Sequence, residues 1–152
     1  MKRVVMGFGG VVSLVAVVAG LVGCASAPPA PAPSVYKQLG GREGISQVVD
    51  DFVANVVADN RINTRFKALT PPMVFKLKSN LADQICDATG GPCSYLGKDM
   101  KNAHFGMKIT EGEWNATVEA LVKALDKNNV PAGAKTALLG ALGPMKPDIV
   151  GQ

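Results

Sequence analysis

The chain has 152 residues, of which 47% are apolar and 18% are charged, and its formal net charge is +4. This length predicts one domain rather than two. The basic residues form no runs and do not alternate with aromatic residues, so the charge pattern excludes a nucleic-acid-binding protein.

The first 23 residues form a predicted export signal. Lys2 and Arg3 precede an apolar stretch over residues 4–22, and small residues lead into Cys24. The pattern is similar to a bacterial lipoprotein signal, so we expect removal of residues 1–23 and acylation of Cys24. The alternative is an uncleaved membrane-spanning helix, because the apolar stretch is nearly long enough to cross the hydrocarbon. We favour cleavage, which predicts an exported protein anchored by lipid to a bacterial membrane, at the outer membrane or the periplasmic face.

A change of composition then marks the start of a folded domain. Residues 24–34 are rich in proline and alanine, which favours an extended and solvated tether. From residue 35 the composition is that of ordinary globular sequence without internal repeats. We therefore predict a single folded domain over residues 35–150.

Apolar residues spaced three and four apart predict two long helices in the first half of this domain. The first carries the apolar positions Ile45, Val48, Val49, Phe52, Val53, Val56 and Val57. The second begins near Thr70 and Pro71, which are typical of a capping residue and a first-turn proline, and ends before Gly90-Gly91-Pro92.

Two further helices are predicted in the second half. Thr110 and Glu113 have the spacing of a capping box, and an apolar stripe follows as far as Leu125. The last helix begins at Pro131 and ends near Gly143 or a few residues later. Because no segment alternates with period two, the predicted fold class is all-α.

The segment between the second and third helices does not fit this pattern. Residues 86–109 contain several glycines and one proline, with only a short helical turn predicted over residues 99–104. A single turn on flexible connections is not stable through local propensity alone. We therefore expect something bound there to stabilise it.

His104 is the only histidine in the chain and lies in this weakly supported segment. A lone histidine is more often a surface or satisfied core residue than a ligand. Its apolar neighbours Met100, Ala103 and Phe105 nevertheless favour a flat apolar cofactor with a metal bound by one imidazole.

Three stretches of the sequence together resemble group 1 truncated haemoglobins. They are residues 36–45, residues 49–52 and residues 90–100 leading to His104, with the paired glycines as the most telling feature. The resemblance covers residues 35–150. It implies an all-α truncated globin fold, a two-over-two helical sandwich around non-covalent haem b.

The resemblance also implies roles for individual residues. His104 matches the proximal iron ligand, and Phe66 matches the phenylalanine that packs on the haem face. Tyr95 and Met100 match positions on the proximal side. Positions around or behind the distal pocket are matched by Phe52, Leu77, Leu81, Gln84 and Ile85. For Phe52, Leu81 and Ile85, ordinary packing in the helix core is an equally good interpretation.

Val53 departs from the family pattern, which commonly has a tyrosine there whose hydroxyl donates a hydrogen bond to the gas ligand. Loss of one such bond predicts several-fold to about a hundred-fold weaker retention of oxygen. The four predicted distal-pocket residues are Val53, Leu77, Leu81 and Gln84. Among them, Gln84 is the one obvious polar side chain that could donate a hydrogen bond to the gas. We therefore expect a largely apolar distal pocket and a raised carbonyl stretching frequency in the carbon monoxide complex.

A methionine or lysine side chain is the alternative left open for a sixth ligand to the iron. A single histidine excludes bis-histidine coordination within one chain, and no Cys-x-x-Cys-His motif is present for covalent haem. Cys86 and Cys93 flank the Gly-Gly-Pro turn and form either a disulfide or two reduced, packed thiols.

The sequence thus predicts a haem-binding globin that reversibly binds oxygen, nitric oxide or carbon monoxide. One alternative is a haem-dependent nitric oxide dioxygenase, peroxidase or redox sensor, whose turnover requires an external reductase. The other is a haem-free helical lipoprotein. The expected partners are a diatomic gas, the membrane through the N-terminal lipid, and no nucleic acid.

Overall fold

The computed structural model describes residues 32–152. The predicted signal over residues 1–23, the lipidation of Cys24 and most of the tether lie outside this range. Within it, no helix is both long and apolar enough to cross a membrane.

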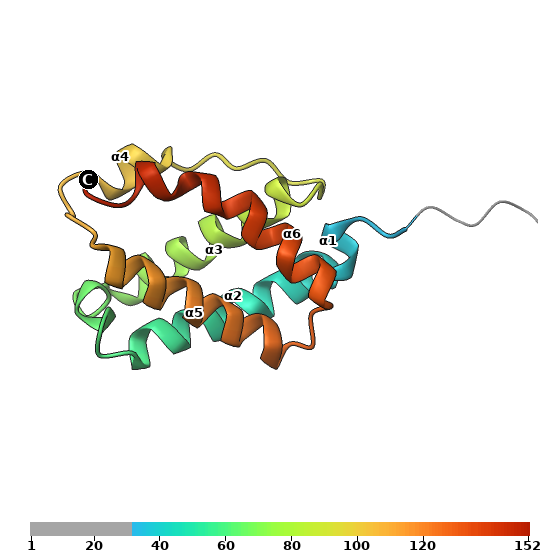
Figure 1. Ribbon diagram of the computed structural model, residues 1–152, viewed down its shortest axis with the longest axis horizontal. Helices are drawn as coiled ribbons and strands as arrows, with labels where there is room; N and C mark the ends of the chain where they lie inside the picture. The colour runs from blue at the N-terminus through green and yellow to red at the C-terminus, as the bar shows by residue number, and fades with distance from the viewer. Residues whose placement is uncertain (1–31) are drawn as a thin grey trace, which may run out of the picture. The chain divides into compact units, whose positions relative to one another are not determined.

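The described part of the chain is all-α, as predicted (Figure 1). Its elements are α1 (Val35–Gln38), α2 (Gly41–Ala58), η1 (Asn63–Arg65), α3 (Pro71–Ala88), α4 (Met100–His104), α5 (Glu111–Lys127), α6 (Ala132–Leu142) and η2 (Gly143–Asp148), where η marks a 3₁₀-helix. The four predicted long helices correspond to α2, α3, α5 and α6. The single turn α1 was not predicted, because one turn carries no apolar stripe.

Of the two helix caps predicted from the sequence, the cap of α5 is present as predicted and the cap of α3 differs. At the start of α5 the full capping box is present: the Thr110 hydroxyl accepts from the Glu113 amide, and the Glu113 carboxylate accepts from the Thr110 amide. At the start of α3, Thr70 is the capping residue, but its hydroxyl makes no capping hydrogen bond. Pro71 and Pro72 occupy the first two helical positions, so one of the amides that a capping hydroxyl normally bonds is missing.

Helix α2 is central to the packing and contacts both α3 and α5 (Figure 1). Helix α6 contacts α1 and α3, and η2 continues from it to reach α4. The chain end therefore lies beside the short helix that carries His104.

The glycine pair after α3 has a conformational reason. Gly90 has a φ of 77°, in the left-handed region that glycine adopts most readily. A Cβ at Gly91 would lie 2.5 Å from the Cys86 sulfur and 2.6 Å from the Tyr36 ring, so only glycine fits. The pair thus lets the chain turn tightly at the end of α3.

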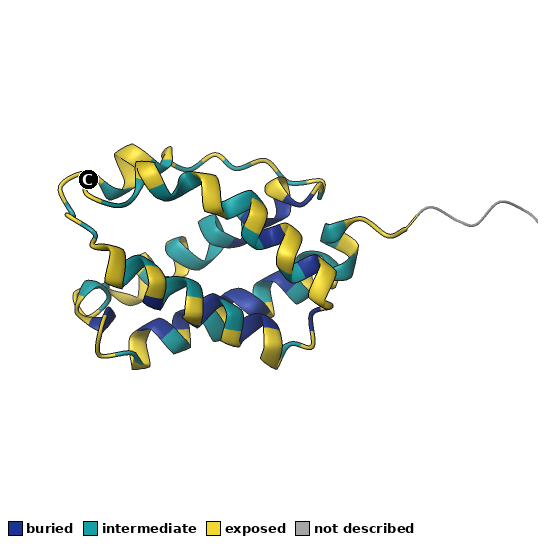
Figure 2. Ribbon diagram, in the orientation of Figure 1, coloured by how far each residue is buried: buried dark blue, intermediate teal, exposed yellow. Residues whose placement is uncertain are grey.

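Buried apolar side chains form two clusters along α2. The main cluster joins α2 to the last turns of α3, the second half of α5 and the first half of α6. A smaller cluster of Val56, Ile62, Ala116 and Ala120 joins the end of α2 to α5. In contrast, α4 and η2 contain no buried residue, and the buried residues of α3 lie only in its last two turns (Figure 2). The apolar side chains of α4 and η2 are therefore only partly covered by protein.

Candidate functional site

His104 is the last residue of α4 and is half-buried. Its Nδ1 lies 2.8 Å from the carbonyl oxygen of Met100, one turn earlier in the same helix. With the proton on Nδ1, the ring donates to that carbonyl and leaves the Nε2 lone pair for a metal. Within residues 32–152 the ring makes no other hydrogen bond, so its orientation suits a metal ligand.

Half-buried apolar side chains lie on α3, α5, α6 and η2, and directly after η2. They are Leu77, Leu81, Trp114, Val118, Leu142, Met145 and Ile149. Apolar surface left uncovered costs free energy, about 25 cal/mol per Å². This donor set, one imidazole among apolar side chains, fits a flat apolar cofactor bound through a metal.

The predicted distal residues lie near one another. Val53 and Ile85 are members of the main cluster, and Phe52 and Leu81 pack against it. Leu77 is half-buried but belongs to neither cluster.

Phe66 follows η1 and packs against the smaller cluster. Phe52 packs against this cluster and the main one. Phe66, which was predicted to pack on the haem face, therefore shares this smaller cluster with Phe52.

Gln84 is directed toward the His104 segment. Its amide Nε2 lies 3.5 Å from the sulfur of Met100 and 3.4 Å from the sulfur of Met145. The side chain thereby links α3 to α4 and η2. In this arrangement the amide is engaged by the two thioethers.

The approach to α4 is held by the protein itself. Cys86 and Cys93 form a disulfide with a Cα–Cα distance of 5.7 Å, which ties the end of α3 to the loop before α4. Farther along the loop, the Tyr95 amide donates to the Asp87 carboxylate at 3.1 Å, and the Tyr95 hydroxyl donates to the Lys98 carbonyl at 2.7 Å. Burial, followed by the charge of Asp99, raises the pKa of the Tyr95 hydroxyl, which therefore stays protonated at neutral pH.

The exit from α4 is also anchored, by residues that the sequence did not reveal as part of a site. Arg65 donates to the Met107 carbonyl at 2.7 Å and pairs with Glu113. On the C-terminal side, the Gly151 amide donates to the Ile109 carbonyl at 2.8 Å. Protein contacts therefore hold both ends of this segment, and stabilisation by a bound group stays a prediction. No sequence signal links these pairs, which lie more than 40 residues apart.

Two surface hollows lie elsewhere and contain none of the predicted site residues. One is lined mainly by polar residues at the end of α2 and on α5, including Asn55, Asp59 and Lys123. The other includes Asp50 and Lys78, which pair with each other at 2.9 Å. Both are open to solvent and carry charge, so neither suits a flat apolar cofactor.

Comparison with known proteins gives a family match over most of the chain. A family model described as bacterial-like globin matches residues 34–150. The group 1 truncated haemoglobin of Mycolicibacterium paratuberculosis is 33% identical over 116 residues, which cover 76% of this chain and 83% of that protein.

Solved structures agree with this match. The truncated haemoglobin of Tetrahymena pyriformis aligns with a TM-score of 0.73 at 26% identity, covering 79% of this chain and all of that one. The 2/2 haemoglobin of a Synechococcus strain, which has covalently attached haem, aligns with a TM-score of 0.70 at 27% identity and covers 78% of this chain and 98% of that one. The predicted two-over-two helical fold is thus confirmed.

Proposed function

Because the chain belongs to the bacterial-like globin family, we propose that residues 35–150 bind haem b non-covalently through His104 and reversibly bind a diatomic gas. The observation that carries the proposal is the orientation of His104, whose Nδ1 is engaged by the Met100 carbonyl at 2.8 Å. That bond orients the ring and leaves Nε2 for the iron. Bound haem supplies an iron centre at which oxygen, nitric oxide or carbon monoxide can coordinate.

Apolar side chains of this chain support the haem assignment. Leu77 and Leu81 on α3 would cover one face of the ring, and Met100 on α4 would contact the other. Phe66 would pack against the edge or face near η1. These residues would exclude water from the iron, which protects the gas complex from side reactions.

Non-covalent attachment follows from the shortage of reactive side chains. Cys86 and Cys93 are joined to each other, so neither thiol is available to bond a vinyl group of the haem. The one histidine in the sequence is assigned to the iron. We therefore do not propose for this chain the covalent haem attachment found in the Synechococcus relative.

We also propose that the protein is exported and lipid-anchored through Cys24. The support is the signal-like pattern before Cys24 together with the Cys86–Cys93 disulfide. Disulfides persist mainly in oxidising compartments such as the periplasm. For any turnover in such a location, we propose that an external reductase supplies the electrons.

Titration of the purified full chain with haemin tests the function. We expect wild type to develop a Soret band with saturating 1:1 uptake, and His104→Gly to lose most of this binding because the protein ligand to iron is gone. Added imidazole should restore the band in His104→Gly by replacing the missing side chain. Lys101→Ala is the matched control, because Lys101 is an exposed residue of the same helix with no side-chain bond within the described range.

Two outcomes would contradict parts of the proposal separately. Absence of a Soret band in wild type would exclude haem binding. A wild-type spectrum in His104→Gly without imidazole would instead exclude His104 as the iron ligand.

A further inference from the structure

The backbone that follows His104 lacks regular structure and needs support from elsewhere. Gly106 has a φ of 77° and Lys108 a φ of 50°, so left-handed residues lie on both sides of Met107. Residues other than glycine rarely adopt left-handed backbone angles, and they keep them only where the surrounding structure holds them there. The position of this segment therefore depends on contacts from other elements.

Arg65 provides such a contact from η1. Its Nη1 donates to the Met107 carbonyl at 2.7 Å, and the Met107 amide donates to the His104 carbonyl at 3.0 Å. A chain of two hydrogen bonds thus connects the guanidinium with the backbone of His104.

Glu113 holds the same guanidinium from α5. Its two carboxylate oxygens accept from Nε of Arg65 at 2.8 Å and from Nη2 at 3.1 Å. The flat fork of an arginine matches the two oxygens of a carboxylate, which restricts where the third donor can point. In this case the third donor points at Met107.

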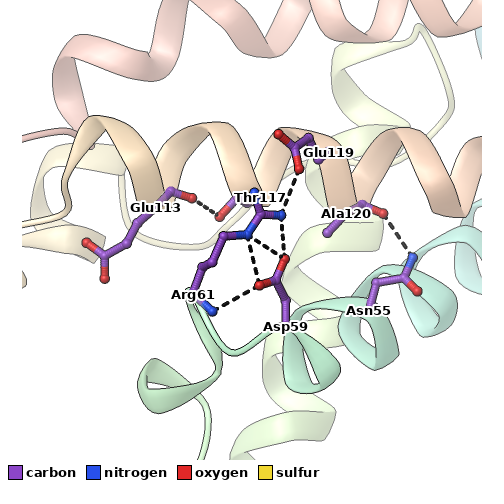
Figure 3. A network of polar contacts seen from close by, with 7 residues as sticks. All are labelled: Asn55, Asp59, Arg61, Glu113, Thr117, Glu119 and Ala120. Carbon is purple, nitrogen blue, oxygen red and sulfur yellow. Dashed lines mark hydrogen bonds and ion pairs between the residues drawn. The ribbon is translucent and has the colours of Figure 1, made fainter.

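The surroundings of this pair favour a strong interaction. The Arg65 and Glu113 side chains are 31% and 16% exposed. By comparison, Arg61, which lies between α2 and η1, pairs with Glu119 on α5, and these two side chains are 52% and 53% exposed (Figure 3). Solvent weakens exposed pairs most. Arg61 also pairs with Asp59 at 2.7 Å, so Arg61 and Glu119 form a second, more exposed contact between an arginine and a carboxylate of α5.

We propose that Arg65 and Glu113 are positioning residues that hold the segment after His104 and so set how the iron ligand is oriented and how long haem is retained. The inference rests on the proposed haem function. Neither residue would contact the iron; both would act through Met107 and the His104 backbone.

Arg65→Gln, Arg65→Lys and Glu113→Gln in the haem-loaded full chain test the proposal. Two quantities are measured: the iron–histidine stretching band of the ferrous, ligand-free protein by resonance Raman, and the rate of haem transfer to excess apomyoglobin. We expect Arg65→Gln to shift or broaden the band and to speed haem transfer about 10-fold, because a charge-assisted bond to the Met107 carbonyl is lost. Arg65→Lys should give a rate of haem transfer between those of wild type and Arg65→Gln, because an ammonium cannot bond both Glu113 oxygens and the Met107 carbonyl with the geometry of a guanidinium. Glu113→Gln should have the smaller effect, because Arg65 can still reach Met107.

Arg61→Gln and Glu119→Gln are the matched controls. They remove equal charges from the other pair, and neither residue bonds the segment after His104. We expect both variants to keep the wild-type band and transfer rate. A band and a rate in Arg65→Gln that equal those of Arg61→Gln would overturn the proposal, even if the two variants differ in thermal stability.

Hydrogen exchange in the apoprotein separates this inference from the proposed function. Peptides covering residues 105–109 should exchange faster in Arg65→Gln than in Arg61→Gln, whether or not haem binds. If wild type takes up no haem, the function fails while this comparison still tests the contact. Equal exchange in the two variants would overturn the positioning role.

Discussion

The side chains that would face a bound gas determine how strongly the protein can hold it. Val53 is 5% exposed and apolar, and Leu77 and Leu81 are apolar as well. The amide of Gln84 is engaged by Met100 and Met145. A gas ligand would therefore find no strong hydrogen-bond donor among these residues.

Leu81→Gln is expected to slow oxygen dissociation by about 10-fold, because an amide donor would then reach the gas. The carbonyl stretching frequency of the carbon monoxide complex should fall for the same reason. Leu81→Met is the matched control, since it keeps the side chain apolar and nearly conserves its volume. A low carbonyl frequency in wild type would show that a donor is already present and would contradict the apolar pocket.

At the scale of an element, the first turn of α5 combines two roles in one carboxylate. Glu113 completes the capping box with Thr110 and also pairs with Arg65. The hydrogen bond from Arg65, followed by the one from the Thr110 amide, lowers the pKa of Glu113 from 4.5 to about 2. Ionised Glu113 therefore stabilises the folded chain.

This pKa shift predicts a pH dependence. Because the folded pKa lies below the unfolded one, the stabilisation is complete above about pH 4.5 and is lost as the pH falls through about 2. Between these values the free energy of unfolding should fall more steeply in wild type than in Glu113→Gln, as measured by urea denaturation across the range. Glu119→Gln should change the slope less, because solvent screens that exposed pair. Identical slopes in wild type and Glu113→Gln would contradict the assignment.

At the scale of the whole domain, stability is unevenly distributed. The main cluster of buried side chains lies away from α4, and α4 itself contains no buried residue. Five residues form too short a helix to be stable alone. The loop before α4 therefore depends on its covalent link to α3, the Cys86–Cys93 disulfide.

Replacing both cysteines by alanine should lower the free energy of unfolding by about 2–3 kcal/mol on the chain-entropy account of a short closed loop. Denaturation of the apoprotein with and without a reducing agent measures this. The reductant should lower the midpoint of wild type and leave the double variant unchanged. A wild-type midpoint that does not respond to reduction would show that the bond contributes little.

The positions of the long helices could be predicted from the residues alone, because apolar spacing and capping residues act within a few positions of one another. The glycine pair and the capping box at Thr110 were recognisable for the same reason. Three local features escaped prediction: the single turn α1, the 3₁₀-helix η1 and the missing capping bond of the Thr70 hydroxyl.

The candidate site was predictable only in its single histidine and in residues that match a family pattern. Three features depend on distances across the fold. They are the bond between Cys86 and Cys93, the direction of the Gln84 amide and the partner of Arg65. Arg65 and Glu113 are 48 residues apart, and each alone reads as an ordinary surface charge. Short-range order therefore follows from local chemistry, whereas contacts between distant residues arise only when packing brings their helices together.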